Sequence, residues 1–148
     1  MMKMNWKIAS MLAFLGAVAC LVWLISMRSF FGAGPVTITI QIAAAGLMIW
    51  ARLQFGLRSF HATANPTAGG LVTRGPYRFL RHPIYAAVVY FVWAGVAGHP
   101  SATAILAAML ATVCLGVRMR AEEILLMREY PDYAAYSRRT ARVLPFLF

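Results

Sequence analysis

The stretch PIYAAVVYFVWAGVAGHPSATAILAAMLATVCLGV, residues 83–117, decides the fold of this chain. It carries no formal charge. As one straight helix it would be about 52 Å long, well beyond the roughly 30 Å of a bilayer's hydrocarbon core. The breaker GHPS at 98–101 divides it into two halves of about 16 residues, each roughly 24 Å long. We therefore expect a tight helical hairpin, of the spanning or the re-entrant kind.

The second helix of this hairpin is expected to continue beyond the apolar run. The segment GVRMRAEEILLMREY contains no breaker before Pro131, so the sequence predicts one long helix from about 101 to 130. Pro131 ends this helix and can open a short new one, because proline suits a first turn but not a helix interior.

Two further apolar runs precede the hairpin. Residues 8–27 form the first, and the turn FFGAGP at 30–35 separates it from a second span at about 35–54. A helix is favoured over a strand for VTITI, because a lone strand in lipid leaves its backbone unpaired. Small residues recur at a spacing of four, which is typical of closely packed membrane helices: Ala9, Ala13 and Ala17, then Ala104, Ala108, Thr112 and Gly116.

The composition supports a membrane protein. Of 148 residues, 61% are hydrophobic and 12% charged, against about 25% charged in soluble domains. We predict a single all-α domain over residues 1–148, polytopic, with about four transmembrane or re-entrant helices and a short C-terminal helix. Cys20 and Cys114 lie inside apolar runs and suggest small hydrophobic side chains, not a disulfide framework.

The charge is strongly basic, with 14 Lys and Arg against 4 Asp and Glu, a net charge of +10. The arginines flank apolar runs, so we expect membrane lipids and anionic small molecules as partners, not nucleic acid. One side of the predicted helices carries most of the basic residues: Lys3, Lys7, the connector 52–81 and the basic C-terminal segment. The other side carries Arg28. The positive-inside rule then predicts that both termini and the polar motifs are cytoplasmic.

The first polar motif is RGPYRFLRHPIY, residues 74–85. Pro83 suits the first turn of a helix, which leaves Arg81 and His82 at the helix mouth beside unpaired backbone N–H groups. This arrangement suits an anionic ligand. The alternative is that the arginines only anchor the helix at the lipid headgroups.

The second motif is RMRAEEILL, residues 118–126. Glu122 and Glu123 point about 100° apart on a helix, so they cannot face one ligand equally. Arg118 and Arg120 stand four and three residues before them, which allows two ion pairs on a solvated face. The functional alternative is that one carboxylate binds ribose-like hydroxyls or a cation while arginine holds the other.

The third motif, EYPDYAAYSRRTARVLPFLF at 129–148, places Tyr133 and Tyr136 on one helix face, followed by arginines. Alone, it is equally typical of an interfacial amphipathic anchor. The three histidines show no metal-ligand spacing, and we find no phosphate loop or GxGxxG motif, so we expect no metal.

Taken in order, LVTRGPYRFLRHPIY, the short hairpin, RMRAEEILL and YPDYAAYSRRTARVLPF resemble the membrane methyltransferases related to isoprenylcysteine carboxyl methyltransferase and the phospholipid methyltransferases. The resemblance covers about residues 50–148. It departs from the family at Ala87 and Pro131, where glycine is frequent. Members use S-adenosylmethionine, bound at the cytoplasmic side. The resemblance implies a cofactor site formed by Tyr77, His82, Pro83, Tyr85, Glu122 and Glu123.

The resemblance also implies a lipid-like or apolar methyl acceptor near Arg81 and Arg139, with Tyr133 and Tyr136 contributing to its binding. A carboxylate acceptor is already ionised at neutral pH and needs only orientation by arginine. An amine acceptor needs a base, for which the glutamates are candidates. Arg81, Arg139 and Glu122 are therefore the candidate catalytic residues.

Two other functions are compatible with parts of the pattern. Membrane sterol and steroid reductases, which use NADPH, have a similar RHP-Y stretch and a similar tyrosine-containing tail, but the adjacent glutamates favour the methyltransferase. A non-enzymatic adaptor that binds anionic lipid would need only the basic face.

Overall fold

The computed structural model describes residues 5–55 and 71–144, and it is all-helical in the described ranges apart from one isolated β-bridge. Its α-helices are α1 (Trp6–Ser26), α2 (Pro35–Phe55), α3 (Pro83–Gly98), α4 (Ala102–Glu129) and α5 (Tyr133–Ser137), and the 3-10 helix η2 spans Gly75–Arg78. The predicted break at 98–101, the long helix and the short helix after Pro131 are thus confirmed. Much of the predicted connector, residues 56–70, lies outside the described residues.

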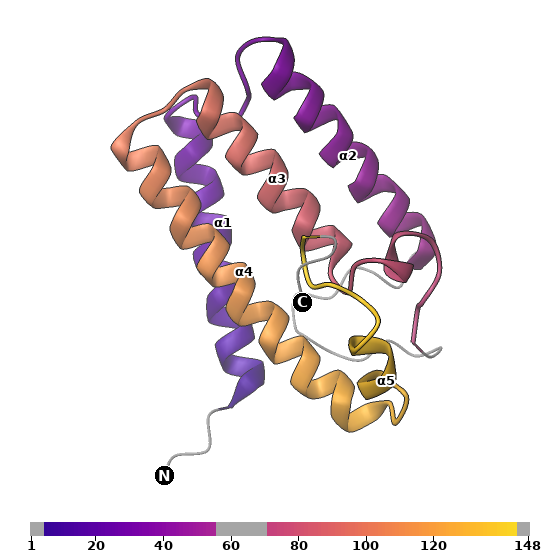
Figure 1. Cartoon of the computed structure of the whole chain (residues 1–148). Coiled ribbons are helices and arrows are strands. Elements are labelled where there is room, and N and C mark those ends of the chain that lie inside the picture. The colour runs from indigo at the N-terminus through magenta and orange to yellow at the C-terminus, as the bar shows by residue number, and fades with distance from the viewer. Residues whose placement is uncertain (1–4, 56–70, 145–148) are drawn as a thin grey trace.

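The four long helices run alternately up and down (Figure 1). α4 packs chiefly against α1, and α3 against α2. Residues 27–34 and 99–101 connect the helices at one end, which we call the turn end. The opposite end, where α3 begins and α4 finishes, is the polar end; α5 and the tail, residues 138–144, lie there.

The turn between α3 and α4 is tight, as predicted, but the two helices then diverge and make few contacts further along. Near the turn, α1, α3 and α4 share one apolar core, which contains Leu24, Val92, Val96, Ala104, Ala107 and Ala108. Toward the polar end the tail fills the space between α3 and α4 (Figure 1). The divergence therefore makes room for polar side chains.

The α1–α4 contact is close because small residues face it. The buried side of α1 consists of Ser10, Ala13, Ala17, Cys20 and Leu24. A Cβ atom at Gly16 would lie 3.0 Å from the Sγ of Cys114. The predicted small-residue pattern is confirmed at Ala13 and Ala17 in α1 and at Ala104 and Ala108 in α4, which are all buried.

The turn end is fastened by a buried glutamine. The Nε2 of Gln41 donates to the backbone oxygens of Phe30 (2.8 Å) and Phe91 (3.0 Å), and its Oε1 accepts from the N–H of Gly32 (2.9 Å). A Cβ at Gly95 would lie 2.2 Å from the oxygen of Phe30. This polar side chain in an apolar helix therefore joins the first loop to α3.

Three helices are long and apolar enough to span a membrane: α1, α2 over Pro35–Gln54, and α4. α3 is also apolar but is 16 residues long. Large apolar side chains face outward along these helices, among them Leu12, Val22, Ile42, Leu53, Leu106 and Val113. Such exposure suits contact with lipid. The prediction of an all-α, multi-helix membrane architecture is confirmed.

Candidate functional site

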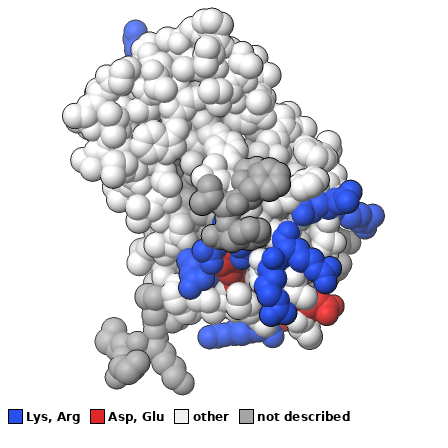
Figure 2. Space-filling model, in the orientation of Figure 1, with Lys and Arg blue, Asp and Glu red and all other residues white. Residues whose placement is uncertain are grey.

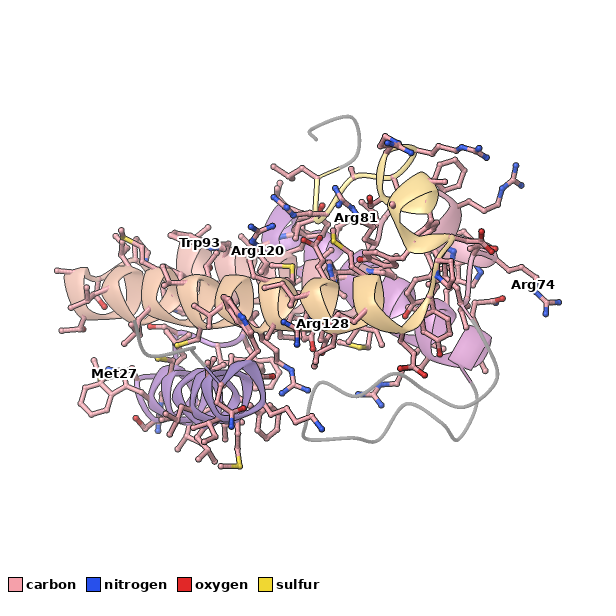
Figure 3. All side chains as sticks on the ribbon, turned by 90° about the horizontal axis from the view of Figure 1, so that it is seen from below. Met27, Arg74, Arg81, Trp93, Arg120 and Arg128 are labelled. Carbon is pink, nitrogen blue, oxygen red and sulfur yellow. The ribbon has the colours of Figure 1, made fainter. Side chains whose placement is uncertain are left out.

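On the face shown in Figure 2, nearly all charged side chains lie at the polar end. Lys and Arg side chains surround acidic groups there, and the rest of this face is almost uncharged. The start of α3, the polar part of α4, α5 and the tail meet there. Figure 3 shows Arg81 lying among the side chains between α4 and the tail, whereas Arg74 extends away from the molecule. The first motif thus contributes both inward and outward arginines.

Glu123 is the centre of the site and has no exposed surface. Its carboxylate accepts from Arg81 Nη1 at 3.3 Å and from Arg142 Nε and Nη2, each at 3.1 Å. The Nε2 of His82 lies 3.4 Å from the same carboxylate, and Arg120 Nη1 lies 3.5 Å away. A buried carboxylate requires such partners, because removing it from water is otherwise very costly.

Glu122 occupies a different environment, with 22% of its side chain exposed. The hydroxyl of Tyr85 donates to Glu122 Oε1 and accepts from Arg118 Nε, at 2.6 Å in the latter case. His82 stands between the two glutamates, with its Nδ1 3.7 Å from Glu122 Oε2. Of the adjacent acids, Glu122 is the one whose carboxylate reaches the surface of the site.

The two ion pairs anticipated within α4 are both present, Arg118 with Glu122 and Arg120 with Glu123, at 3.5 Å each. The interpretation as a solvated face is nevertheless wrong, because Glu123 and Arg118 are buried. The functional alternative, in which arginine holds one of the carboxylates, describes Glu123 well.

Arg118 connects α1 to the site. Its guanidinium carbon lies 5.0 Å from the centre of the Phe14 ring and 5.9 Å from that of Tyr85. A cation above an aromatic face is attracted by the ring quadrupole, more strongly where water is excluded. The first helix therefore helps to fix the arginine that contacts Tyr85 and Glu122.

The tail runs beside the segment that precedes α3. The N–H groups of Arg81 and His82 donate to the backbone oxygens of Ala141 (2.7 Å) and Arg142 (3.2 Å), and the N–H of Ala141 donates to Phe79 O (2.9 Å). Leu80 and Ala141 form the isolated parallel bridge. The tail therefore occupies the N–H groups of Arg81 and His82 themselves, and the expected unpaired N–H groups are left to the first turn of α3. Pro83 does begin α3, as predicted.

Three predicted tyrosines lie beside this cluster: Tyr77 and Tyr133 are buried, and Tyr136 is partly buried. Tyr133 is 1% exposed, and its hydroxyl has no hydrogen-bond partner among the described residues. The hydroxyl of Tyr136 donates to the backbone oxygen of Tyr77 at 2.8 Å. Burial raises the pKa of Tyr77 and Tyr133, and it raises the pKa of Tyr136 to about 12. Hydrogen bonding to Glu123 raises the pKa of Arg142.

Arg139 lies elsewhere. Its exposed side chain lines an open pocket of about 600 Å³ beside α5, together with Arg78, Asp132 and Tyr136. It has no ion pair with either glutamate. The candidate residues thus divide into two groups. The glutamate cluster includes Arg81, His82, Tyr85, Tyr77 and Tyr133, and the separate pocket is lined by Arg139 and Tyr136.

Three residues that contact the glutamates were not among the predicted site residues: Arg118, Arg120 and Arg142. A signal for Arg118 was present, since a charged residue that follows an apolar helical run directly is costly unless it has a partner. No local pattern distinguishes Arg142 from its neighbours. Within residues 5–55 and 71–144, no group of three or more His, Cys, Asp or Glu could hold a metal.

One relative found by comparison with curated proteins is the nickel-cobalt-cadmium resistance protein NccN of Alcaligenes xylosoxydans xylosoxydans. The chain is 39% identical to it over 80 residues. The match covers 52% of this chain and 37% of the relative, so the chain spans little more than a third of that protein's length. No solved structure matches the chain.

The profile of the isoprenylcysteine carboxyl methyltransferase (ICMT) family matches residues 36–128, which is more than half of the 148 residues. The match includes η2, α3, His82, Tyr85 and both adjacent glutamates, whereas α1, α5 and the tail lie outside it. The chain belongs to the isoprenylcysteine carboxyl methyltransferase family.

Proposed function

We propose that this protein is an S-adenosylmethionine-dependent methyltransferase that acts on a lipid-like or apolar acceptor at the cytoplasmic face of a membrane. The observation that carries the proposal is that His82 and Tyr85 converge on the carboxylate of Glu122, which reaches the surface. Family membership supports the reaction class. The basic loops on the side of the polar end support the cytoplasmic orientation.

The side chains present fit such a cofactor. The hydroxyl of Tyr133 and the Nε of Arg81 are buried and lack hydrogen-bond partners in the described residues. These two donors can therefore pair with polar groups of a bound molecule. Without such a partner, a buried donor is left unsatisfied, which is costly. The carboxylate of Glu122 and the ring of Tyr85 suit a cationic or hydroxyl-bearing group.

S-adenosylmethionine would supply the methyl group, carried on a positively charged sulfur. In the proposed assignment, Glu122, His82, Tyr85 and Tyr77 bind and orient the cofactor, and Glu123 fixes the surrounding cations. Positioning of this kind can account for much of the rate of a displacement. Arg81 would orient a carboxylate acceptor, and Glu122 would accept a proton from an amine acceptor.

Titration calorimetry of the full chain in detergent tests the proposal, with S-adenosylmethionine and S-adenosylhomocysteine as ligands. We expect both to bind to the unmodified protein, and Glu122→Gln to raise Kd about tenfold or more, because a charge-assisted contact contributes about 1.5–3 kcal/mol. Glu129→Gln, a matched change at an exposed position of the same helix, should leave Kd unchanged. If neither ligand binds but NADPH raises the Tm, the reductase alternative is correct.

The acceptor can be identified independently. Native membranes that contain the protein are incubated with radiolabelled S-adenosylmethionine, and the labelled product is separated and characterised. We expect label in an apolar, lipid-extractable product with the unmodified protein and its loss with Glu122→Gln. Label that is confined to water-soluble products would contradict a lipid-like acceptor while leaving the reaction class intact.

A further inference from the structure

The pocket beside α5 is separate from the glutamate cluster and has its own charge. Arg78 enters it from η2, and Asp132, Tyr136 and Arg139 enter from α5 and its two ends. Leu71 and Ala135 provide apolar surface in the same lining. The lining of this open pocket of about 600 Å³ thus includes two arginines and one aspartate.

These two arginines differ from those around the glutamates. Arg81, Arg118 and Arg142 are all engaged by Glu122 or Glu123. The chain has four acidic residues, Glu122, Glu123, Glu129 and Asp132, and all of them lie in the described ranges. Within those ranges neither Arg78 nor Arg139 forms an ion pair. Asp132 in the same lining offsets one of the two positive charges without an ion pair, so the pocket keeps a net excess of one positive charge.

We propose that this pocket binds a phosphate group, with Arg78 and Arg139 as the ligands that hold it. The planar guanidinium donates two parallel hydrogen bonds to phosphate oxygens, and two arginines from different elements can hold one group from two sides. The site lies at the polar end of the membrane helices, where lipid headgroups are found. The phosphate of a lipid and a soluble phosphate share this chemistry.

A phosphate bound in the pocket would also stabilise the position of the tail. Tyr136 lines the pocket and donates to Tyr77 O, and the Oγ1 of Thr140 donates to Tyr136 O at 2.9 Å. The next residues, Ala141 and Arg142, pair with the segment before α3 and with Glu123. A phosphate that holds Arg139 therefore acts on the same short segment that completes the glutamate cluster. This site is additional to the proposed catalytic function and does not depend on it.

Native mass spectrometry of the detergent-purified full chain tests the proposal, with phosphatidylglycerol and phosphatidylcholine added in turn. We expect one tightly retained phosphatidylglycerol, and about tenfold weaker retention in Arg78→Gln and in Arg139→Gln. Arg138→Gln removes the same charge from the adjacent exposed position, which does not line the pocket. It should retain the lipid like the unmodified protein.

Calorimetry with inorganic phosphate distinguishes the source. Phosphate binding that Arg139→Gln abolishes, without retention of phosphatidylglycerol, would assign the pocket to a soluble phosphate compound. Equal losses in all three variants would overturn the proposal in favour of diffuse attraction to a basic surface, as would an unmodified protein that binds neither probe. A Tm measurement on each variant separates loss of binding from loss of folding, and Arg139→Lys should restore binding only in part because it cannot donate in parallel.

Discussion

Arg142 and Glu123 form a two-point ion pair, with Arg142 Nε 3.1 Å from Glu123 Oε1 and Nη2 3.1 Å from Oε2. Arg142 belongs to the tail, and Glu123 lies near the C-terminal end of α4. The pair therefore connects the tail to the helix at the point where the site is most buried.

Glu123→Gln should destabilise the protein strongly. The substitution leaves Arg81, His82 and Arg142 around a neutral amide in a buried place, and breaking a buried ion pair typically costs about 3–5 kcal/mol. We expect a clear fall in Tm in detergent by circular dichroism. Glu129→Gln, on the exposed end of the same helix, should change Tm little, and equal effects would show that Glu123 is not the centre of the cluster.

Tyr85→Phe should affect the site only through Glu122. The change removes the hydroxyl that donates to Glu122 and accepts from Arg118. In a double-mutant cycle on the Kd for S-adenosylhomocysteine, we expect Tyr85→Phe and Glu122→Gln to couple by about 1 kcal/mol or more. Tyr90→Phe is the control, because its hydroxyl donates to Val143 O. It should be additive with Glu122→Gln; coupling of equal size would refute a specific contact.

Phe14→Leu should weaken cofactor binding although Phe14 lies outside the family match. The ring holds the guanidinium of Arg118, and a desolvated cation–π contact contributes up to about 2 kcal/mol, or roughly thirtyfold in Kd. Phe14→Trp should retain binding. Leu15→Ala, at the neighbouring outward-facing position, serves as the control; a similar loss in that variant would indicate general damage to α1.

Gly95→Ala should destabilise the fold, because the added methyl would lie 2.2 Å from the Phe30 oxygen. Overpacking of this kind typically costs about 1–3 kcal/mol. Gly116→Ala provides the comparison, since its Cβ would meet no atom within 4 Å. The latter should be neutral or slightly stabilising by helix propensity. Thermal unfolding in detergent measures both, and equal Tm values would contradict the close contact at the turn end.

Alkaline pH should weaken the polar end. Burial raises the pKa of Tyr136 to about 12, above the roughly 10 of an unfolded tyrosine. The stability from keeping this hydroxyl protonated is full below pH 10 and is lost as pH rises toward 12. Tyr136→Phe should reduce the fall in Tm over this window. Tyrosinate absorbance measured in parallel should lose one late-titrating tyrosine in this variant, while Tyr77 and Tyr133, whose pKa burial also raises, continue to titrate late. An unchanged late amplitude would assign the titration between pH 10 and 12 to other tyrosines.

Much of the helical pattern could be predicted because its signals are local. GHPS and Pro131 interrupt helices wherever they occur, so the expected helix of about 101–130 corresponds to Ala102–Glu129. The pairing of α4 with α1 and of α3 with α2 was not predicted. It depends on the shapes of whole helix surfaces, and a hairpin alone suggests that α3 and α4 pack along their full lengths.

For the site, the family resemblance implied that residues 82–85 lie beside the paired glutamates, and His82 and Tyr85 do contact them, while their roles stay predictions. The motifs could not show which glutamate is buried, because that depends on the rotation of α4 against the tail. The pairing of Ala141 with Leu80 was also outside their reach, since it joins segments about 60 residues apart. The rotation of α4 brings Arg118 to Glu122, and the pairing of the tail with Leu80 brings Arg142 to Glu123.

The backbone pairing of the tail also has a consequence for how the protein is made. Residues 141 and 142 are synthesised after all four long helices. They supply the carbonyl partners of Arg81 and His82 and one of the cations that pair with Glu123. The helices can thus enter the bilayer while the acidic centre is still incomplete. We therefore expect assembly of the polar end to finish last, and a chain that stops before Thr140 would lack these contacts between the tail and the helices.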